Sequence, residues 1–146
     1  MQLTEHFSLA ELTVTDTGLD NTPDAAQTDL LKTLAEFLEK VRTILGNNPV
    51  TINSAFRSAA VNAAVGGVSD SAHALAYAAD IECPAFGSPW DVANALSKAQ
   101  EEGKLDFDQL IYEQTWTHVS RDPQLREQRL TFVPADNSYL DGLVGP

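Results

Sequence analysis

Two histidines and one aspartate are the residues of this sequence whose chemistry suits a metal ion. His73 precedes Asp80 by seven positions, and His118 follows much further along, in the segment WTHVS. Imidazole and carboxylate are suitable zinc ligands, and three protein ligands leave the fourth tetrahedral position for water, as in a catalytic site. The spacing is not the i, i+4 pair of a helical zinc motif, so the alternative is a surface histidine and a solvated aspartate.

The alternation of residues 77–83 predicts a strand that carries Asp80. Ala78, Asp80 and Glu82 would share one face of it, and Tyr77, Ala79, Ile81 and Cys83 the other. A carboxylate among alanines on a strand needs a compensating partner, which a metal ion would supply. Cys83 is the single cysteine, so an internal disulfide is excluded, and we expect a buried small residue rather than a nucleophile.

The segments around these residues occur in the order found in a known family. SAFRSAAVNAAVGG precedes the Ser-x-His of His73, the Ala-Ala-Asp of Asp80 and the Trp-x-His-Val-Ser of His118. Together with HFSLAELT and DNTP further upstream, they resemble the zinc D-Ala-D-Ala peptidases in the branch shared by phage endolysins and small bacterial carboxypeptidases. The resemblance spans roughly residues 6 to 120. It implies a Hedgehog/DD-peptidase-like fold and a zinc metallopeptidase with ligands His73, Asp80 and His118.

The resemblance also implies a substrate and residues that bind it. The substrate would be a peptide bond of peptidoglycan stems or cross-links, cut by a D-Ala-D-Ala carboxypeptidase or an endolysin-like endopeptidase, with L-Ala-D-Glu as another bond in the same polymer. Arg57 would bind the substrate's carboxylate, which the guanidinium fork matches, or else pair locally on the surface. Ser71 would hydrogen-bond the substrate, although serine is also an ordinary turn former. Trp116 would line the pocket or belong to the core.

Glu113 is the candidate general base, on a geometric argument. If residues 107–113 and 116–120 form a hairpin that turns at Gln114 and Thr115, Glu113 faces Trp116 and shares a sheet face with His118. Its carboxylate could then take a proton from the attacking water and pass it to the leaving amine. Gln-Thr is not a favoured two-residue turn, and offset strands would point Glu113 into solvent.

Two positions depart from the family pattern. Relatives commonly place the catalytic carboxylate three residues before the last histidine, where this chain has Thr115, although in the endolysin-like branch a glutamate ends the strand, as Glu113 does. They usually have glycine three residues after the first histidine, where this chain has Ala76; at positive φ, alanine costs about 1 kcal/mol. Thr115 leaves open a catalytically weak or inactive zinc-bearing binding or structural module, such as a phage particle component. A metal-free interaction domain is a third hypothesis.

Periodicity and capping residues predict four helices and a small sheet. A long core helix is expected from a cap at Thr22, with Pro23 in its first turn, to Gly46. Shorter helices are expected after Ser8 and Ser58, and another runs from Ser88 to Gly103. Strands are expected over residues 49–55, 77–83, 107–113 and 116–120, with a last strand around 130–133 and an irregular tail. The fold class is α+β, a small mostly antiparallel sheet with helices packed alongside.

Length and charge bound the remaining possibilities. The 146 residues form a single domain, 1–146, with formal net charge −12 and His6, Asp70 and Asp108 expected at the surface. Nucleic acid and anionic membranes are therefore poor partners, and an acidic enzyme gains no electrostatic steering towards anionic peptidoglycan. No signal peptide or membrane span is recognised. We expect a monomer synthesised in the cytoplasm that acts on the cell wall after release, or in association with a phage.

Overall fold

The fold is built on one sheet with helices packed beside it, and the computed structural model describes all residues 1–146. The elements in chain order are α1 Leu9–Leu12, α2 Ala25–Ile44, β1 Thr51–Ser54, α3 Ala59–Ala64, β2 Ala78–Glu82, α4 Pro89–Glu101, β3 Gln109–Tyr112, β4 Thr117–Ser120, β5 Gln128–Val133 and β6 Ser138–Asp141. The six strands lie in the order β1-β2-β4-β3-β5-β6. Only β3 and β5 pair in parallel. The predicted α+β class, with a mostly antiparallel sheet, is confirmed.

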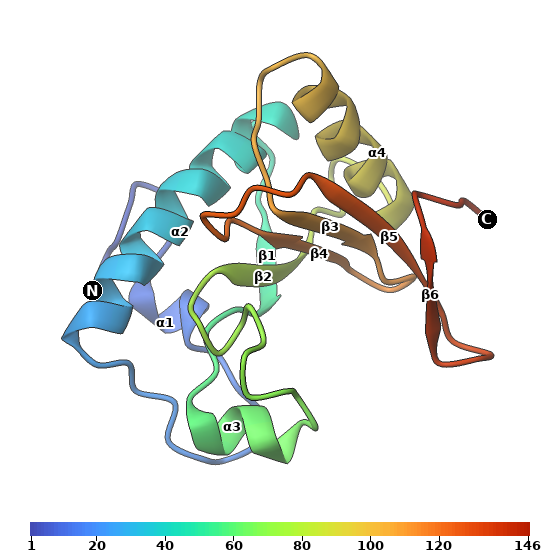
Figure 1. The fold of residues 1–146 in the computed structure, drawn as a ribbon. Coiled ribbons are helices and arrows are strands. Elements are labelled where there is room, and N and C mark those ends of the chain that lie inside the picture. Colours follow the sequence, from blue (N-terminus) through green and yellow to red (C-terminus); the bar gives the residue numbers. More distant parts are fainter.

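The two faces of the sheet have different roles. Figure 1 shows α2 and α4 together on one side, with α3 apart from them and below the sheet in this view. Buried residues of β2, β3 and β4 pack with α2 and α4 in one hydrophobic cluster that includes Ile81, Leu110, Val119, Leu38 and Leu96. Because successive strand residues point to opposite faces, Asp80 and His118 project from the other side of the same strands.

Helix α2 has the predicted apolar stripe but begins later than expected. Its N-cap is Asp24, whose carboxylate accepts a hydrogen bond from the Gln27 amide while the Gln27 side chain accepts one from the Asp24 amide. The predicted cap at Thr22 is therefore wrong, because the reciprocal capping box forms at Asp24. Gly46, at φ +76°, follows the helix in the left-handed conformation that glycine tolerates, as predicted.

The other predicted helices are confirmed. Ser8 and Glu11 form a capping box for α1, and Ser58 caps α3 by accepting a hydrogen bond from the Val61 amide. Ser88 and Asp91 form the capping box of α4, with proline in its first turn. These caps lie in the sequence immediately before apolar periodic segments, so local signals are sufficient to predict them.

Strands β3 and β4 form the hairpin on which the Glu113 hypothesis depends. Ile111 pairs with His118, and the Glu113 amide donates to the Trp116 carbonyl at 3.1 Å. The turn therefore consists of Gln114 and Thr115, as predicted. Gln114 adopts φ 73°, which supplies the left-handed conformation that a two-residue hairpin turn requires.

Two expectations about the surface and the tail are wrong. Residues 138–141 form β6, paired with β5, where an irregular tail was expected. Asp108 is only 1% exposed, and Arg126 holds both of its carboxylate oxygens. The side chain of His6 is 34% exposed, as expected of a surface residue, and its Nδ1 lies 2.7 Å from Glu39 Oε1 on α2. Asp70 is exposed, as expected.

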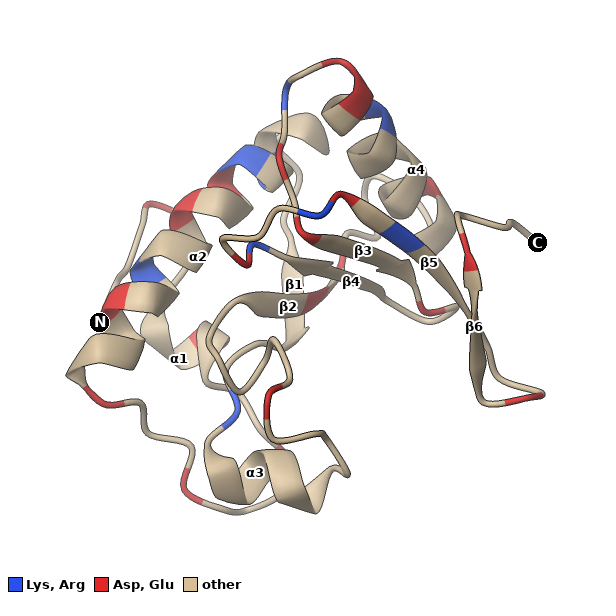
Figure 2. Ribbon diagram, viewed as in Figure 1, with Lys and Arg blue, Asp and Glu red and all other residues tan.

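The charged residues follow the acidic composition. Figure 2 shows acidic positions spread over helices, loops and strand ends rather than gathered at one place. No helix is both long enough and apolar enough to cross a membrane.

Candidate metal centre

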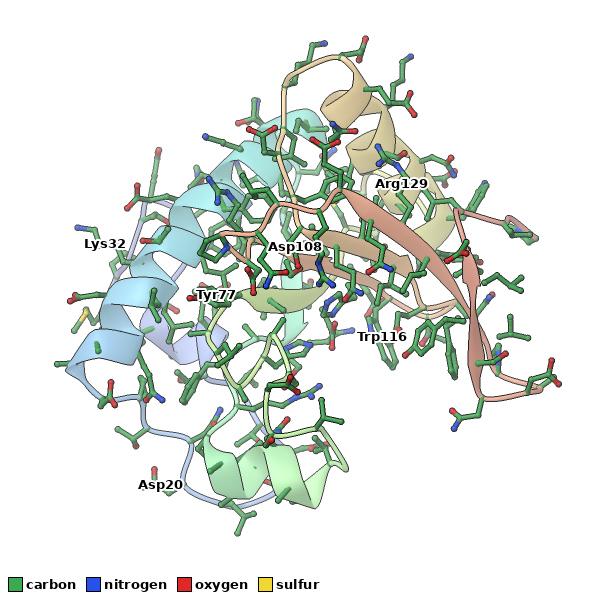
Figure 3. All side chains as sticks on the ribbon, in the orientation of Figure 1. Asp20, Lys32, Tyr77, Asp108, Trp116 and Arg129 are labelled. Carbon is green, nitrogen blue, oxygen red and sulfur yellow. The ribbon has the colours of Figure 1, made fainter.

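His73, Asp80 and His118 come together in one buried group. Asp80 and His118 are register partners on the neighbouring strands β2 and β4. His73 lies in the loop between α3 and β2, and its Nε2 lies 3.3 Å from Asp80 Oδ2. One ligand atom from each residue lies within 4.8 Å of the other two, and each residue is less than 9% exposed. The structure thus brings together the three residues predicted as metal ligands. Figure 3 shows all side chains on the ribbon, with Trp116 labelled beside the β3–β4 hairpin.

The orientation of His73 is fixed by a backbone carbonyl. Its Nδ1 lies 2.7 Å from the Ala55 carbonyl oxygen, which can only accept, so Nδ1 carries the hydrogen. Nε2 therefore presents a lone pair, and it lies 3.3 Å from Asp80 Oδ2. Two facing lone pairs repel each other unless a cation or a proton lies between them. A hydrogen bond from the distal ring nitrogen to a carbonyl is the usual support for a metal-binding histidine.

Asp80 is held in its ionised form. Burial alone would raise its pKa, but hydrogen bonding and positive charge from the two imidazoles, when these are protonated, lower the pKa well below the usual range. Asp80 uses both oxygens, one towards each histidine. A buried carboxylate that stays charged between two imidazoles is a suitable anionic ligand for a divalent ion.

His118 leaves one ring nitrogen without a partner. Its Nδ1 lies 2.9 Å from Asp80 Oδ1, while Nε2 is buried and makes no hydrogen bond. If the hydrogen of the neutral ring is on Nδ1, the lone pair of Nε2 is buried without a partner. If the hydrogen is on Nε2, the lone pair of Nδ1 faces the Asp80 carboxylate, in the same way as the lone pair of His73 Nε2. Either arrangement leaves an imidazole nitrogen that a cation would satisfy.

The three side chains lie close enough together to share one ion. His118 Nδ1 lies 2.9 Å from Asp80 Oδ1, and His73 Nε2 lies 3.3 Å from the other oxygen, Oδ2. One ligand atom from each residue lies within 4.8 Å of the other two, as the ligands of one zinc ion must. Because the protein offers three ligands, a fourth position would remain for water or substrate.

An open pocket of about 370 Å³ adjoins the centre and includes Asp80 in its wall. Arg57 lines it, and its Nη2 lies 3.8 Å from Asp80 Oδ2. Trp116 also lines the pocket, and its Nε1 is buried without a hydrogen-bond partner. The remaining lining residues are Val14, Thr15, Asp16, Asn53, Ser54, Val61 and Val65. A guanidinium among polar and apolar side chains suits a carboxylate-bearing peptide.

Glu113 lies on the same face of the sheet as the centre. It is half-buried, and burial raises its pKa, as does the negative charge of Asp80, whereas His118, Tyr139 and Trp116 lower it. A carboxyl group with a raised pKa near a metal centre is a typical general base. Thr115, at the position where relatives commonly carry the carboxylate, is exposed in the turn.

Ser71 has local structural partners. Its hydroxyl donates to Asn62 Oδ1 at 3.1 Å and accepts from the Ala74 amide at 3.1 Å, so it shapes the loop that carries His73. It does not line the pocket, and its role in binding substrate stays a prediction. Ala76 adopts φ 64°, the conformation that the glycine of relatives predicts.

Sequence reasoning missed two contributors to this region. Residues 14–16 line the pocket but have only the polar composition of a loop. Tyr139 influences Glu113 from β6, a strand that was not expected. The sequence did contain a turn signal, the dipeptide Asp136-Asn137 between two β-prone segments, and Asn137 adopts φ 48° in the structure.

Comparison with known sequences places the chain in a class. The sequence profile of the family Peptidase M15 matches residues 5–120, so the chain belongs to the peptidase M15 family. A segment of 44 residues is 43% identical to the zinc D-Ala-D-Ala carboxypeptidase of Streptomyces albus G. That segment covers 30% of this chain and 17% of the carboxypeptidase.

Proposed function

We propose that this chain is a zinc metallopeptidase that hydrolyses a peptide bond in peptidoglycan stem peptides or cross-links. The observation that carries the proposal is the buried His73–Asp80–His118 group at the edge of an open pocket. Membership of the M15 peptidases and the likeness to a zinc carboxypeptidase support zinc as the cofactor.

The residues of the site have separate roles in the proposed reaction. His73, Asp80 and His118 would hold the zinc, which when bound polarises a carbonyl and lowers the pKa of water. Glu113, ionised on the same sheet face, takes a proton from the attacking water and returns it to the leaving amine. Arg57 binds the substrate's carboxylate with its fork and so sets the scissile bond beside the centre.

The nature of Arg57 favours a substrate with a free carboxylate close to the scissile bond. A carboxypeptidase acting on D-Ala-D-Ala termini meets this condition, and so does an endolysin-like enzyme whose stem peptides carry free carboxylates. In either case the enzyme works on the cell wall after release from the cell or as part of a phage. We further propose that it acts as a monomer.

Digestion of purified peptidoglycan, followed by mass analysis of the fragments, tests this proposal. Loss of a terminal alanine indicates the carboxypeptidase, and separated cross-linked stems indicate the endopeptidase. The His73→Ala variant is the matched control and should release nothing. Unchanged fragments with zinc-loaded parent protein would favour the second candidate, a zinc-bearing binding module, for which Thr115 in place of the usual carboxylate is the supporting observation.

A further inference from the structure

The C-terminal hairpin brings one more side chain to the face of the sheet that carries Glu113. In the parallel pairing of β3 and β5, Tyr112 lies beside Thr131, which puts Glu113 next to Phe132. In the pairing of β5 and β6, Phe132 lies opposite Tyr139. Residues that are register partners share a face, so Glu113, Phe132 and Tyr139 form a row across three strands.

The intervening residues of β5 confirm which face this is. Arg129 points to the helix side, where its Nε donates to Ser97 Oγ of α4 at 2.7 Å. Thr131 has the same parity as Arg129 and is buried. Phe132 and Tyr139 therefore point away from α4, to the side of the sheet that holds the metal centre.

The ring of Tyr139 belongs to this row. It packs against Phe132 with ring centroids 5.3 Å apart and an interplanar angle of 51°. Burial raises the pKa of Tyr139, and the Glu113 carboxylate raises it further; in return the Tyr139 hydroxyl lowers the pKa of Glu113 against the effect of burial. Both effects agree with the row, which places the two side chains on one face of the sheet with Phe132 between their strands.

The backbone that carries Tyr139 is held firmly to β5. The Thr131 hydroxyl donates to the Gly142 carbonyl and accepts from the Val144 amide, both at 2.8 Å. The Gly142 amide donates to the Arg129 carbonyl at 2.8 Å. These bonds continue the β5–β6 ladder past its last pair, so the position of Tyr139 is set by the strand rather than by a loose tail.

We propose that Tyr139 is a positioning residue for Glu113: its hydroxyl donates to the carboxylate and directs it towards the metal centre. Trp116, whose buried Nε1 makes no hydrogen bond, lies on the opposite flank of Glu113, across the β3–β4 hairpin. The residues matched to the family end at 120, so Tyr139 lies outside the segment that the family defines. The catalytic consequence rests on the proposed function, whereas the contact itself does not.

The contact is tested without any activity measurement. In protein with isotope-labelled tyrosine, the resonance of the Tyr139 hydroxyl-bearing carbon should shift when Glu113→Gln removes the charged acceptor. Tyr77, on the other flank of the sheet, should keep its resonance and serves as the internal control. An unchanged Tyr139 resonance would overturn the proposal, whether or not the protein is a peptidase.

The positioning role is tested by Tyr139→Phe, which removes only the hydroxyl. We expect kcat to fall about ten-fold, the usual effect of losing a hydrogen bond to a charged group, with KM and zinc content unchanged. In a Glu113→Gln background the same change should have no further effect, because the acceptor is already altered. Tyr112→Phe, on β3 but facing Trp90 on the other side, is the matched control and should keep the parental kcat.

The positioning role would be overturned if Tyr139→Phe keeps the parental kcat or changes KM alone. It would also be overturned if Tyr139→Phe lowers kcat equally when it is added to Glu113→Gln. If the parent cleaves no peptidoglycan, the proposed function fails, and the resonance measurement still decides the contact between Tyr139 and Glu113.

Discussion

Arg57 has a planar guanidinium group, and a lysine would reproduce its charge but not its shape. Its guanidinium lies near Asp80 and also faces the pocket. Arg57→Lys keeps the positive charge but loses the bidentate fork, so kcat/KM on a substrate with a free carboxylate should fall about ten-fold or more, with the fold intact. Circular dichroism checks the fold, and steady-state kinetics gives the ratio. An unchanged kcat/KM would remove Arg57 from the substrate site.

Glu113 should contribute the largest single catalytic effect among the side chains that do not bind the metal. Glu113→Gln keeps the size of the side chain and removes its basicity, so turnover should fall by about 10²–10⁴-fold while zinc content stays the same. A variant that holds zinc and keeps parental turnover would rule out the general-base role.

The pH profile gives an independent measurement of the same residue. Burial and the charge of Asp80 raise the pKa of Glu113. A base acts only when ionised, so kcat/KM should decline as the pH falls through this raised pKa, above the ordinary glutamate value of about 4.3. The residual activity of Glu113→Gln should lack that decline, and a decline shared by parent and variant would assign it to another group.

At the scale of single elements, the loop after β4 depends on Asp108. This residue precedes β3 and accepts hydrogen bonds from the Arg126 amide and guanidinium at 2.8–2.9 Å. Asp108→Asn should lower the free energy of unfolding by about 2 kcal/mol at neutral pH, as expected for hydrogen bonds to a buried charge. Asp106→Asn, two residues earlier and exposed, is the matched control and should change little. Urea unfolding measures both.

The direction in which the pKa of Asp108 is shifted determines how this stabilisation depends on pH. Hydrogen bonds from Arg126 lower the pKa of Asp108, and burial opposes this less strongly. The stabilisation is therefore complete above the unfolded pKa of about 3.9 and is lost as the pH falls through the lower folded value. The difference between parent and Asp108→Asn should shrink over that acidic range; a difference that stays constant there would contradict this account.

The elements also show how far the sequence can be interpreted without coordinates. Helix α4 could be predicted because its cap, its first-turn proline and its apolar period are adjacent in sequence. The capping of α2 at Asp24 rather than Thr22 was missed because both residues are good caps and only the Gln27 partner decides between them. Strand β6 was missed because it is short, and Tyr139 and Leu140 stay exposed, so it has no buried alternation.

The same reasoning applies to the site. His73, Asp80 and His118 could be predicted because they stand in segments with a recognisable order, and Glu113 could be placed because a hairpin register follows from its turn. Burial of Asp108 depends on Arg126, eighteen residues further along, and the neighbourhood of Glu113 and Tyr139 depends on a parallel pairing. Such long-range partners leave no local pattern in the sequence.

For the whole molecule, the metal centre joins three separate parts of the chain. The loop after α3, β2 and β4 each provide one ligand. An ion that binds only the folded state stabilises it by mass action, so removal of metal with a chelator should lower Tm by several degrees, and added zinc should restore it. Added zinc should not raise the Tm of His73→Ala. A Tm that stays the same in chelator and with added zinc would contradict a metal centre.

The central claim is that this chain holds one zinc through His73, Asp80 and His118. Elemental analysis of the purified protein tests it most directly. We predict one zinc per chain in the parent, none in His73→Ala, and one in His6→Ala, which removes a histidine that pairs with Glu39 and takes no part in the centre. Equal zinc in the parent and His73→Ala, or none in the parent after zinc is supplied, would contradict the account.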